Sequence, residues 1–173
     1  MTYRTIVADP PWQYAAAATK ADAGKLYSTL HLNDIAALGS QVRELAADDA
    51  HLWLWTTNAF MEEGHKIVRE WGFRPLTILT WCKPGPGVGY YLRNNTEHCI
   101  LASRGKPMVP EDKAMSSWYE WPRGAHSAKP EAFLDLVEQV SPGPYLEMFA
   151  RRQRLGWDTW GNEALEHVEI EVA

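Results

Sequence analysis

The residues with the clearest chemical potential lie in the segment TIVADPPWQY, residues 5–14. An apolar, β-branched run ends on Asp9, and Pro10 and Pro11 then stop the strand because they cannot continue its ladder of hydrogen bonds. A carboxylate fixed at a strand end can accept a hydrogen bond from an aromatic amine, and the Pro10 carbonyl can accept a second. Two such acceptors favour a pyramidal amine whose lone pair can attack an electrophile. The alternative is an ordinary polyproline turn in which Trp12 packs locally.

Two segments combine aromatic with basic side chains, GYYLRNN at 89–95 and SSWYEWPRGAH at 116–126. Aromatic faces beside the cations Arg93 and Arg123 suit a base flipped out of a nucleic acid, together with its flanking phosphates. The alternative is that these segments form a lid or a dimer contact. Glu97 begins a predicted strand beside them. It either orients a loop or the target base, or is an edge carboxylate with no such role.

Hydrophobic periodicity predicts the elements that must position these residues. Helical spacing occurs at 34–38 with Asn33 as the cap, at 59–71, and at 131–140 with Pro130 at the first position. Between these helices lie short apolar runs that suit strands buried between helical layers, at 4–8, 51–56, 76–82, 97–102 and 145–150. Strands that alternate with helices predict an α/β fold with a mainly parallel sheet. At this length, and with no long linker, one domain is expected over residues 1–173.

Three segments fit neither pattern: 13–30, 83–96 and 104–128. Each follows a predicted strand. In an open α/β sheet, the loops that leave the carboxyl ends of the strands build the ligand site. We therefore expect the three segments to converge on one edge of the sheet, at Asp9.

Composition and charge indicate which classes of protein this chain resembles least. The formal net charge of −5 does not by itself indicate a nucleic-acid-binding protein, and the tail from about Glu163 is acidic. Between Lys83 and Lys129, however, seven basic residues outnumber four acidic ones, so a locally basic face is expected. Cys82 and Cys99 are expected to be buried thiols of a cytoplasmic protein. The six histidines show no ligand spacing and no apolar run approaches about 18 residues, so neither a metal site nor a membrane span is expected.

The segment ADPPW at 8–12 resembles the signature of the DPPW family of N6-adenine methyltransferases. This family includes the catalytic subunit of the eukaryotic messenger-RNA methyltransferase and many bacterial and phage enzymes. Further blocks follow in the family's order: KLYSTL at 25–30, HLWLWTTNAFMEEG at 51–64, GFRPLTILTWCKP at 72–84, TEHCILASRGKP at 96–107, HSAKPEAF at 126–133 and LEMFARRQRLGWDTWGNE at 146–163. The resemblance covers about residues 4–163.

The resemblance implies a Rossmann-like class I methyltransferase sheet that is circularly permuted, with the catalytic motif near the N-terminus and the cofactor motif near the C-terminus. It also implies S-adenosylmethionine (SAM) as the methyl donor and the exocyclic amine of adenine as the acceptor. Direct displacement at the sulfonium methyl needs orientation and desolvation more than a strong base.

The same resemblance assigns site residues by position. The catalytic residues are Asp9, Pro10, Pro11 and Trp12. Residues expected to bind the substrate are Tyr14, Tyr91, Arg93, Glu97, Trp118 and Arg123. Residues expected to bind the cofactor are Ala8, Asp9, Lys129, Phe149, Arg151, Asn162 and Glu163. Among these, Lys129 is expected at the cofactor carboxylate, and Arg151, Asn162 and Glu163 around the ribose. Arg152 and Arg154 could equally be solvated.

Three functions remain open on the sequence alone. The first is methyl transfer from SAM to the N6 amine of adenine in DNA, and the second is the same chemistry on RNA. The third is a catalytically silent subunit that binds nucleic acid beside an active partner, which the intact Asp9-Pro10-Pro11-Trp12 motif disfavours. DNA is preferred because the chain is compact and carries no added RNA-binding module. A bacterial or phage-encoded protein of the cytoplasm is expected, with a homodimer as one arrangement.

Overall fold

The computed structural model describes residues 1–13, 30–87, 89–106, 108–110, 115–124 and 128–160. Within them one seven-stranded sheet has the order β5-β3-β4-β2-β1-β6-β7. Its strands are β1 Tyr3–Ala8, β2 Ala46–Thr56, β3 Arg74–Cys82, β4 Thr96–Arg104, β5 Trp118–Glu120, β6 Tyr145–Met148 and β7 Trp157–Trp160. The predicted strands at 4–8, 51–56, 76–82 and 97–102 are confirmed as parts of β1, β2, β3 and β4. The strand predicted at 145–150 is confirmed as β6, which ends two residues earlier, whereas β5 and β7 were not predicted.

The sheet is mixed. Strand β1 lies parallel to both β2 and β6, β6 is parallel to β7, and β3 is parallel to β5. Strand β4 runs antiparallel to β2 and to β3. The predicted α/β sheet with mainly parallel strands is therefore confirmed and is consistent with a Rossmann-like methyltransferase fold. Circular permutation stays a prediction. So does one domain with an acidic tail from about 163, because residues 161–173 lie outside the described ones.

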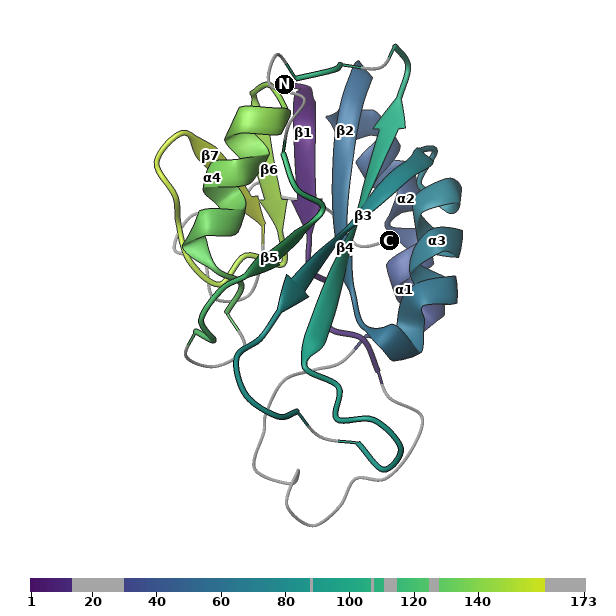
Figure 1. Ribbon diagram of the computed structural model, residues 1–173. Coiled ribbons are helices and arrows are strands. Elements are labelled where there is room, and N and C mark those ends of the chain that lie inside the picture. Colours follow the sequence, from purple (N-terminus) through teal and green to yellow (C-terminus); the bar gives the residue numbers. More distant parts are fainter. Residues whose placement is uncertain (14–29, 88, 107, 111–114, 125–127, 161–173) are drawn as a thin grey trace.

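Helices cover both faces of this sheet (Figure 1). On one face lie α1 Leu32–Ala37, α2 Gly39–Leu45 and α3 Met61–Glu70, which follows the 3-10 turn η1 Asn58–Phe60, and on the other lies α4 Glu131–Val140. The helices predicted at 59–71 and 131–140 are confirmed, but Pro130 is the N-cap of α4 and not its first residue. The predicted cap at Asn33 is wrong, because the first helix begins at Leu32 with His31 as its N-cap. Among the described residues, no helix is long and apolar enough to cross a membrane.

Alternation along β1 divides the core into two clusters. Ile6 and Ala8 pack with α1, α2 and α3, while Val7 packs on the other face with Trp53 and Phe133 of α4. Because successive side chains of a strand point to opposite faces, Asp9 continues the face of Val7. The charge that ends β1 therefore lies on the side of α4.

Strand direction decides which loops leave the sheet at the edge where β1 ends and Asp9 lies. The carboxyl ends of β1, β2, β3 and β6 share one edge, and the antiparallel β4 begins there at Thr96 and Glu97. The expectation that the segment 104–128 leaves at the same edge is wrong, since the end of β4 lies at the opposite edge. Strand β5 runs parallel to β3 and brings the chain back to the first edge at Glu120.

The sheet reverses its winding between β1 and β6. After β1 the chain proceeds to β2 on one side, and after β6 it proceeds to β7 on the other side. The carboxyl ends of two such neighbouring strands leave a crevice where ligands bind in open α/β sheets. Asp9 and Phe149 directly follow these two strand ends.

Candidate active site

The turn after β1 is fixed by backbone hydrogen bonds. The Trp12 amide donates to the Pro10 carbonyl at 2.9 Å, and the Leu30 amide donates to the Pro11 carbonyl at 3.0 Å. Pro10 is itself buried. A carbonyl oxygen has two lone pairs, so the Pro10 oxygen, held in direction by one donor, keeps capacity for another.

Trp12 anchors this turn from the far side of the sheet. Its ring stacks on Phe60 at a centroid distance of 5.4 Å, and its indole N–H donates to the Trp55 carbonyl at 3.0 Å. Only 8% of Trp12 is exposed, and it belongs to the core cluster under α1, α2 and α3. In this structure Trp12 therefore packs in the core against residues that are distant in the sequence. Its catalytic assignment stays a prediction.

Lys129 joins two carboxylates that are far apart in the sequence. Its Nζ lies 2.5 Å from Oδ2 of Asp9, 3.4 Å from Oε2 of Glu97 and 5.2 Å from the centroid of the Trp55 ring. Glu97 also accepts a hydrogen bond from Lys83. The four side chains Lys83, Glu97, Lys129 and Asp9 thus alternate in charge across the site edge.

The mutual attraction of these charges outweighs their desolvation. Burial lowers the pKa of Lys129, but the charges of Asp9 and Glu97 raise it by more, so the pKa lies above the ordinary lysine value. Burial pushes the pKa of Glu97 up, but Lys129 and Lys83 bring it below the ordinary glutamate value. Lys129 and Glu97 therefore stay charged at neutral pH.

A pocket opens at the crevice between β1 and β6. Several predicted cofactor-binding residues line it, namely Asp9, Lys129, Phe149 and Arg151, together with Val7, Trp55, Ala128, Phe133, Leu134, Glu147 and Arg152. Glu97 joins the site through Lys129. The side chain of Ala8, in contrast, is fully buried in the core on the other face. Asn162, Glu163 and the predicted substrate residue Tyr14 lie outside the described residues.

The backbone after β6 turns sharply at the pocket. Phe149 has φ of +63°, in the left-handed region that bulky residues rarely adopt. The turn is held by the Ala150 amide, which donates to the Trp160 carbonyl at 2.9 Å, and by the Phe149 ring, whose centroid lies 5.0 Å from that of Trp160. Backbone strain of this kind is typical of ligand-binding sites, where the surrounding structure maintains it.

The other predicted substrate residues lie outside the pocket. Tyr91 and Arg93 are exposed on the loop between β3 and β4, which extends beyond the sheet edge in Figure 1. Trp118 in β5 is 61% exposed, and Arg123 is exposed shortly after that strand. Strand β5 ends at the same edge of the sheet as β1 and β6, but none of these side chains lines the pocket.

Glu147 is a pocket residue that the sequence analysis missed. Its Oε2 atom is buried and has no hydrogen-bond partner in the part of the chain that the structure describes. Burial raises the pKa of Glu147 to about 7, with Asp9 and Glu131 adding to the effect and Arg152 and Lys129 opposing it. A single carboxylate within the apolar run YLEMFA was the available signal.

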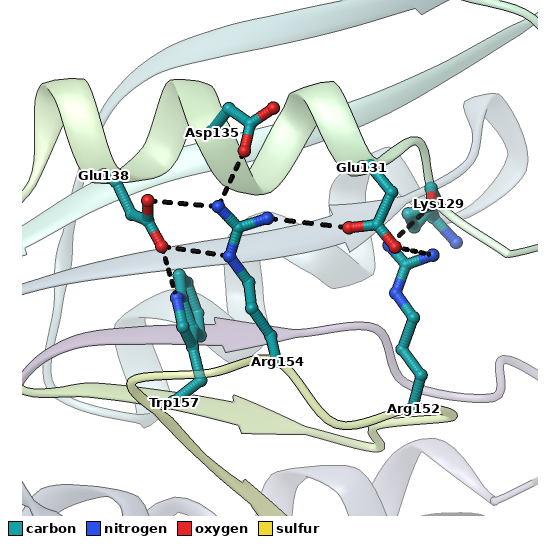
Figure 2. Close-up of polar contacts among 7 residues, drawn as sticks. All are labelled: Lys129, Glu131, Asp135, Glu138, Arg152, Arg154 and Trp157. Atoms are coloured by element: carbon teal, nitrogen blue, oxygen red, sulfur yellow. Dashed lines mark hydrogen bonds and ion pairs between the residues drawn. The ribbon is translucent and has the colours of Figure 1, made fainter.

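Arg154 and Arg152 were also missed, and both are paired (Figure 2). The Arg154 guanidinium lies between three carboxylates of α4: 2.6 Å from Asp135, 3.0 Å from Glu138 and 3.5 Å from Glu131. Glu138 in turn accepts the Trp157 indole N–H at 2.7 Å. The pKa of Arg154 is raised by its hydrogen bonds to Glu138 and Asp135. This network fastens α4 to the segment that leads into β7.

Arg152 extends the network to Lys129. One of its nitrogens lies 2.8 Å from Glu131, and another donates to the Lys129 carbonyl at 3.1 Å (Figure 2). Arg152 therefore holds the backbone of Lys129, while Asp9 holds its ammonium. The sequence could not distinguish these arginines from solvated ones, because their partners lie on a helix 16 or more positions away.

A strand-end carboxylate beside a pocket at the winding reversal of a helix-covered α/β sheet is consistent with a Rossmann-like methyltransferase fold. The chain belongs to the MT-A70 family, whose profile matches residues 3–163. The prediction of an N6-adenine methyltransferase family from the ADPPW block and the blocks after it is thus confirmed.

Individual relatives differ in length. The chain is 31% identical to the type II methyltransferase M.MunI of a Mycoplasma species, over 98% of this chain and 81% of that protein. It is 26% identical to the human N(6)-adenosine-methyltransferase catalytic subunit METTL3, over 93% of this chain and 28% of that protein. A Drosophila melanogaster N(6)-adenosine-methyltransferase MT-A70-like protein is likewise 26% identical, and this chain covers 27% of it. The chain thus spans little more than a quarter of these two longer relatives.

Replacing Arg154 should loosen α4 and the pocket together. We expect Arg154→Ala to lower the free energy of unfolding by about 1–2 kcal/mol, a reduced value because the carboxylates are partly exposed. Arg154→Lys should recover little of this, since a lysine cannot bond three carboxylates as a planar guanidinium does. Chemical denaturation measures the effect. The matched control is Lys66→Ala, which removes an exposed pair to Glu70 at 3.7 Å and should change stability by less than about 0.5 kcal/mol. Equal losses in Arg154→Ala and the control would contradict the network.

Glu147→Gln should stabilise the ligand-free protein in a pH-dependent way. The folded-state pKa of Glu147, about 7, is above its ordinary value of 4.5, so the wild type loses stability as pH rises between these values. Glutamine does not titrate, and the advantage of Glu147→Gln over the wild type should grow through this window to at most about 3 kcal/mol above it. Melting temperatures at pH 5 and pH 8 test this. An advantage that is the same at both values would show that Glu147 is not the titrating group.

Proposed function

We propose that this chain transfers a methyl group from SAM to the exocyclic N6 amine of adenine in DNA. The observation that carries the proposal is the Asp9 carboxylate, which ends β1 beside the pocket and is held by Lys129 at 2.5 Å. Membership of the MT-A70 family supports the chemistry. The similarity to M.MunI, which extends over 81% of that type II methyltransferase, supports DNA and a bacterial cytoplasmic setting. The similarity to METTL3 keeps RNA as the second candidate substrate.

The pocket residues fit the methionyl end of SAM. That end is a zwitterion with one carboxylate and one ammonium, and the pocket lining carries cations at Lys129, Arg151 and Arg152. Among the described residues, three buried side-chain polar atoms have no hydrogen-bond partner, and two of them belong to this lining, Nε1 of Trp55 and Oε2 of Glu147. One orphaned donor and one orphaned acceptor in one pocket support a ligand that carries both an acceptor and a donor.

Lys129 would hold the cofactor carboxylate. The exposed fraction of its side chain is 15%, so an added negative charge at Nζ would be only weakly screened by water. Arg151 would lie by the ribose, as would Asn162 and Glu163 of the family pattern. When bound, SAM supplies a methyl group activated by its sulfonium.

Asp9 and Pro10 would orient the adenine amine. The Asp9 carboxylate and the Pro10 carbonyl accept one amine hydrogen each, which directs the nitrogen lone pair toward the methyl. The negative charge of Asp9 also stabilises the positive charge that develops on the attacking nitrogen. Transfer of the methyl group from the sulfur to this nitrogen would leave the amine positively charged, and the amine would then lose a proton to water.

The exposed flanks of the pocket would bind the nucleic acid. Lys83 and Lys129 were counted in the basic excess, but they are tied to Glu97 and Asp9. Phosphate contacts are therefore assigned to the exposed Arg93 and Arg123 beside Tyr91 and Trp118, which offer stacking faces. The sequence-based predictions that Tyr14 and Glu97 bind the substrate remain part of this proposal. So does the prediction that the chain forms a homodimer.

Methyl transfer itself tests the function. The protein is incubated with isotopically labelled SAM and DNA or RNA oligomers of the same sequence, and the modified nucleoside is identified by mass spectrometry. N6-methyldeoxyadenosine is the expected product. If the label is found only in RNA, the proposed substrate is RNA and not DNA. Cofactor binding without any transfer would favour the catalytically silent subunit.

Asp9→Asn should abolish most transfer while leaving the protein folded, because the Lys129 ammonium keeps Glu97 as a carboxylate partner. Asparagine keeps the shape but removes the charge, and its amide donors can face the donors of the substrate. We expect single-turnover methyl transfer to fall at least ~100-fold, the scale of losing one preorganised electrostatic group. SAM affinity is measured alongside and should remain within a few-fold of the wild type. A folded, SAM-binding Asp9→Asn protein that transfers methyl at the wild-type rate would overturn the role of Asp9.

Nucleic-acid binding should be weak and strongly dependent on salt. Each phosphate contact adds about 0.9 to the slope of log affinity against log salt, so replacing Arg93 and Arg123 by alanine should lower the slope by up to about 2. Fluorescence anisotropy over a salt series measures this. The control replaces Lys66 and Arg69 of α3, which removes the same charge from the other face of the protein. Equal slopes for both double variants would assign the arginines to another role.

A further inference from the structure

Glu147 points into the pocket from the middle of the sheet. It pairs in register with Val7 of β1, and its neighbours Leu146 and Met148 are fully buried on the opposite face under α1, α2 and α3. Alternation along β6 therefore directs Glu147 toward α4, where it lines the pocket with Asp9, Lys129 and Arg152. Neither the family motif nor the sequence analysis gives this carboxylate a role.

The two cations that lower the pKa of Glu147, Arg152 and Lys129, have other partners. Arg152 bonds Glu131 and the Lys129 carbonyl, and the Lys129 ammonium bonds Asp9 and Glu97. No described residue donates a hydrogen bond to Oε2 of Glu147, although the atom is buried. A carboxylate desolvated without a donor lowers the stability of the ligand-free fold. A group of this kind is expected where a ligand supplies the missing donor.

We propose that Glu147 binds the α-ammonium of the methionyl end of SAM. This inference rests on the proposed function and adds a residue to the same site. An ammonium has three donors and a positive charge, and it matches an orphaned carboxylate oxygen in a partly desolvated pocket. With the cofactor carboxylate at Lys129, Glu147 completes a two-point recognition of the amino-acid group. The pocket then selects ligands that carry both charges.

A chemical double-mutant cycle tests this contact without catalysis. The ligands are S-adenosylhomocysteine and its desamino analogue, in which hydrogen replaces the α-amino group. The proteins are the wild type, Glu147→Gln and the control Glu62→Gln, which makes the same substitution on the exposed face of α3. Isothermal titration calorimetry at pH 8 gives six affinities.

The expected result is a selective loss. Glu147→Gln should bind S-adenosylhomocysteine ~10- to 100-fold more weakly than the wild type, the scale of one charge-assisted hydrogen bond. Its affinity for the desamino analogue should change less than about 2-fold, within the error expected for a site that has lost no contact. Glu62→Gln should match the wild type for both ligands. A variant that is more stable than the wild type and yet binds the ammonium ligand more weakly has lost a binding contact rather than its fold.

Other results separate the two proposals. Equal weakening of both ligands by Glu147→Gln, or no weakening of either, would overturn the ammonium contact while leaving the SAM site in place. A wild-type protein that binds neither ligand would overturn the proposed function itself. Glu147→Asp provides a second variant. It keeps the charge at a shorter reach, and it should discriminate between the two ligands better than Glu147→Gln does.

Proton release provides an independent measurement. An ammonium binds the ionised carboxylate, so S-adenosylhomocysteine should displace the proton that Glu147 holds at pH 6. The heat of binding should then vary with the ionisation enthalpy of the buffer in the wild type, and less so in Glu147→Gln. The charged groups that face Glu147 are Arg152, Lys129, Asp9 and Glu131, all present in both proteins. The same buffer dependence in wild type and variant would overturn the proposal.

Discussion

The site depends on the ion pairs that the Lys129 ammonium makes with two carboxylates. This ammonium joins Asp9 at the end of β1 to Glu97 at the start of β4, and the residue itself lies just before α4. Removing one member of such a group leaves an uncompensated charge in a poorly solvated place, which strongly destabilises the fold. Replacing the whole group by hydrophobic residues would cost much less stability. The charges therefore require one another. They also require a sheet that brings the start of an antiparallel strand beside the ends of parallel ones.

The same interaction explains how the ligand-free site tolerates its charges. In the proposed mechanism Asp9 supports a developing positive charge, and in the ligand-free structure Lys129 is already its counter-ion. Binding then becomes an exchange of partners rather than the burial of a new charge. Arg152 and Arg154 hold the backbone of this counter-ion through Glu131 and the other α4 carboxylates, so the position of the ammonium is set by the fold.

Sequence reasoning found what local pattern encodes. The buried strands and the helices α3 and α4 follow from periodicity, and the Asp9 edge follows from Pro10 and Pro11. The antiparallel direction of β4 was not predictable, because an apolar run such as EHCILA reads the same in both directions. Strands β5 and β7 have three and four residues, too few to show a period. Glu147, Arg152 and Arg154 owe their roles to packing across the sheet, which no spacing along the chain reveals.

The destabilising features of the described structure gather around the end of β6. Glu147 has a buried oxygen without a described partner, and two residues later Phe149 adopts a φ of +63°. Both would be relieved by simple substitutions, a glutamine or a glycine, and both lie in the lining of one pocket. The fold maintains this strain from outside, through the Trp160 contacts and the α4 network. A site arranged in this way spends stability to keep an acceptor and a backbone turn ready for a ligand. Glu147 lies in β6 and Phe149 directly follows it, whereas Asp9 directly follows β1. Lys129 bonds Asp9 and lines the same pocket as Glu147 and Phe149, so it links the two strand ends.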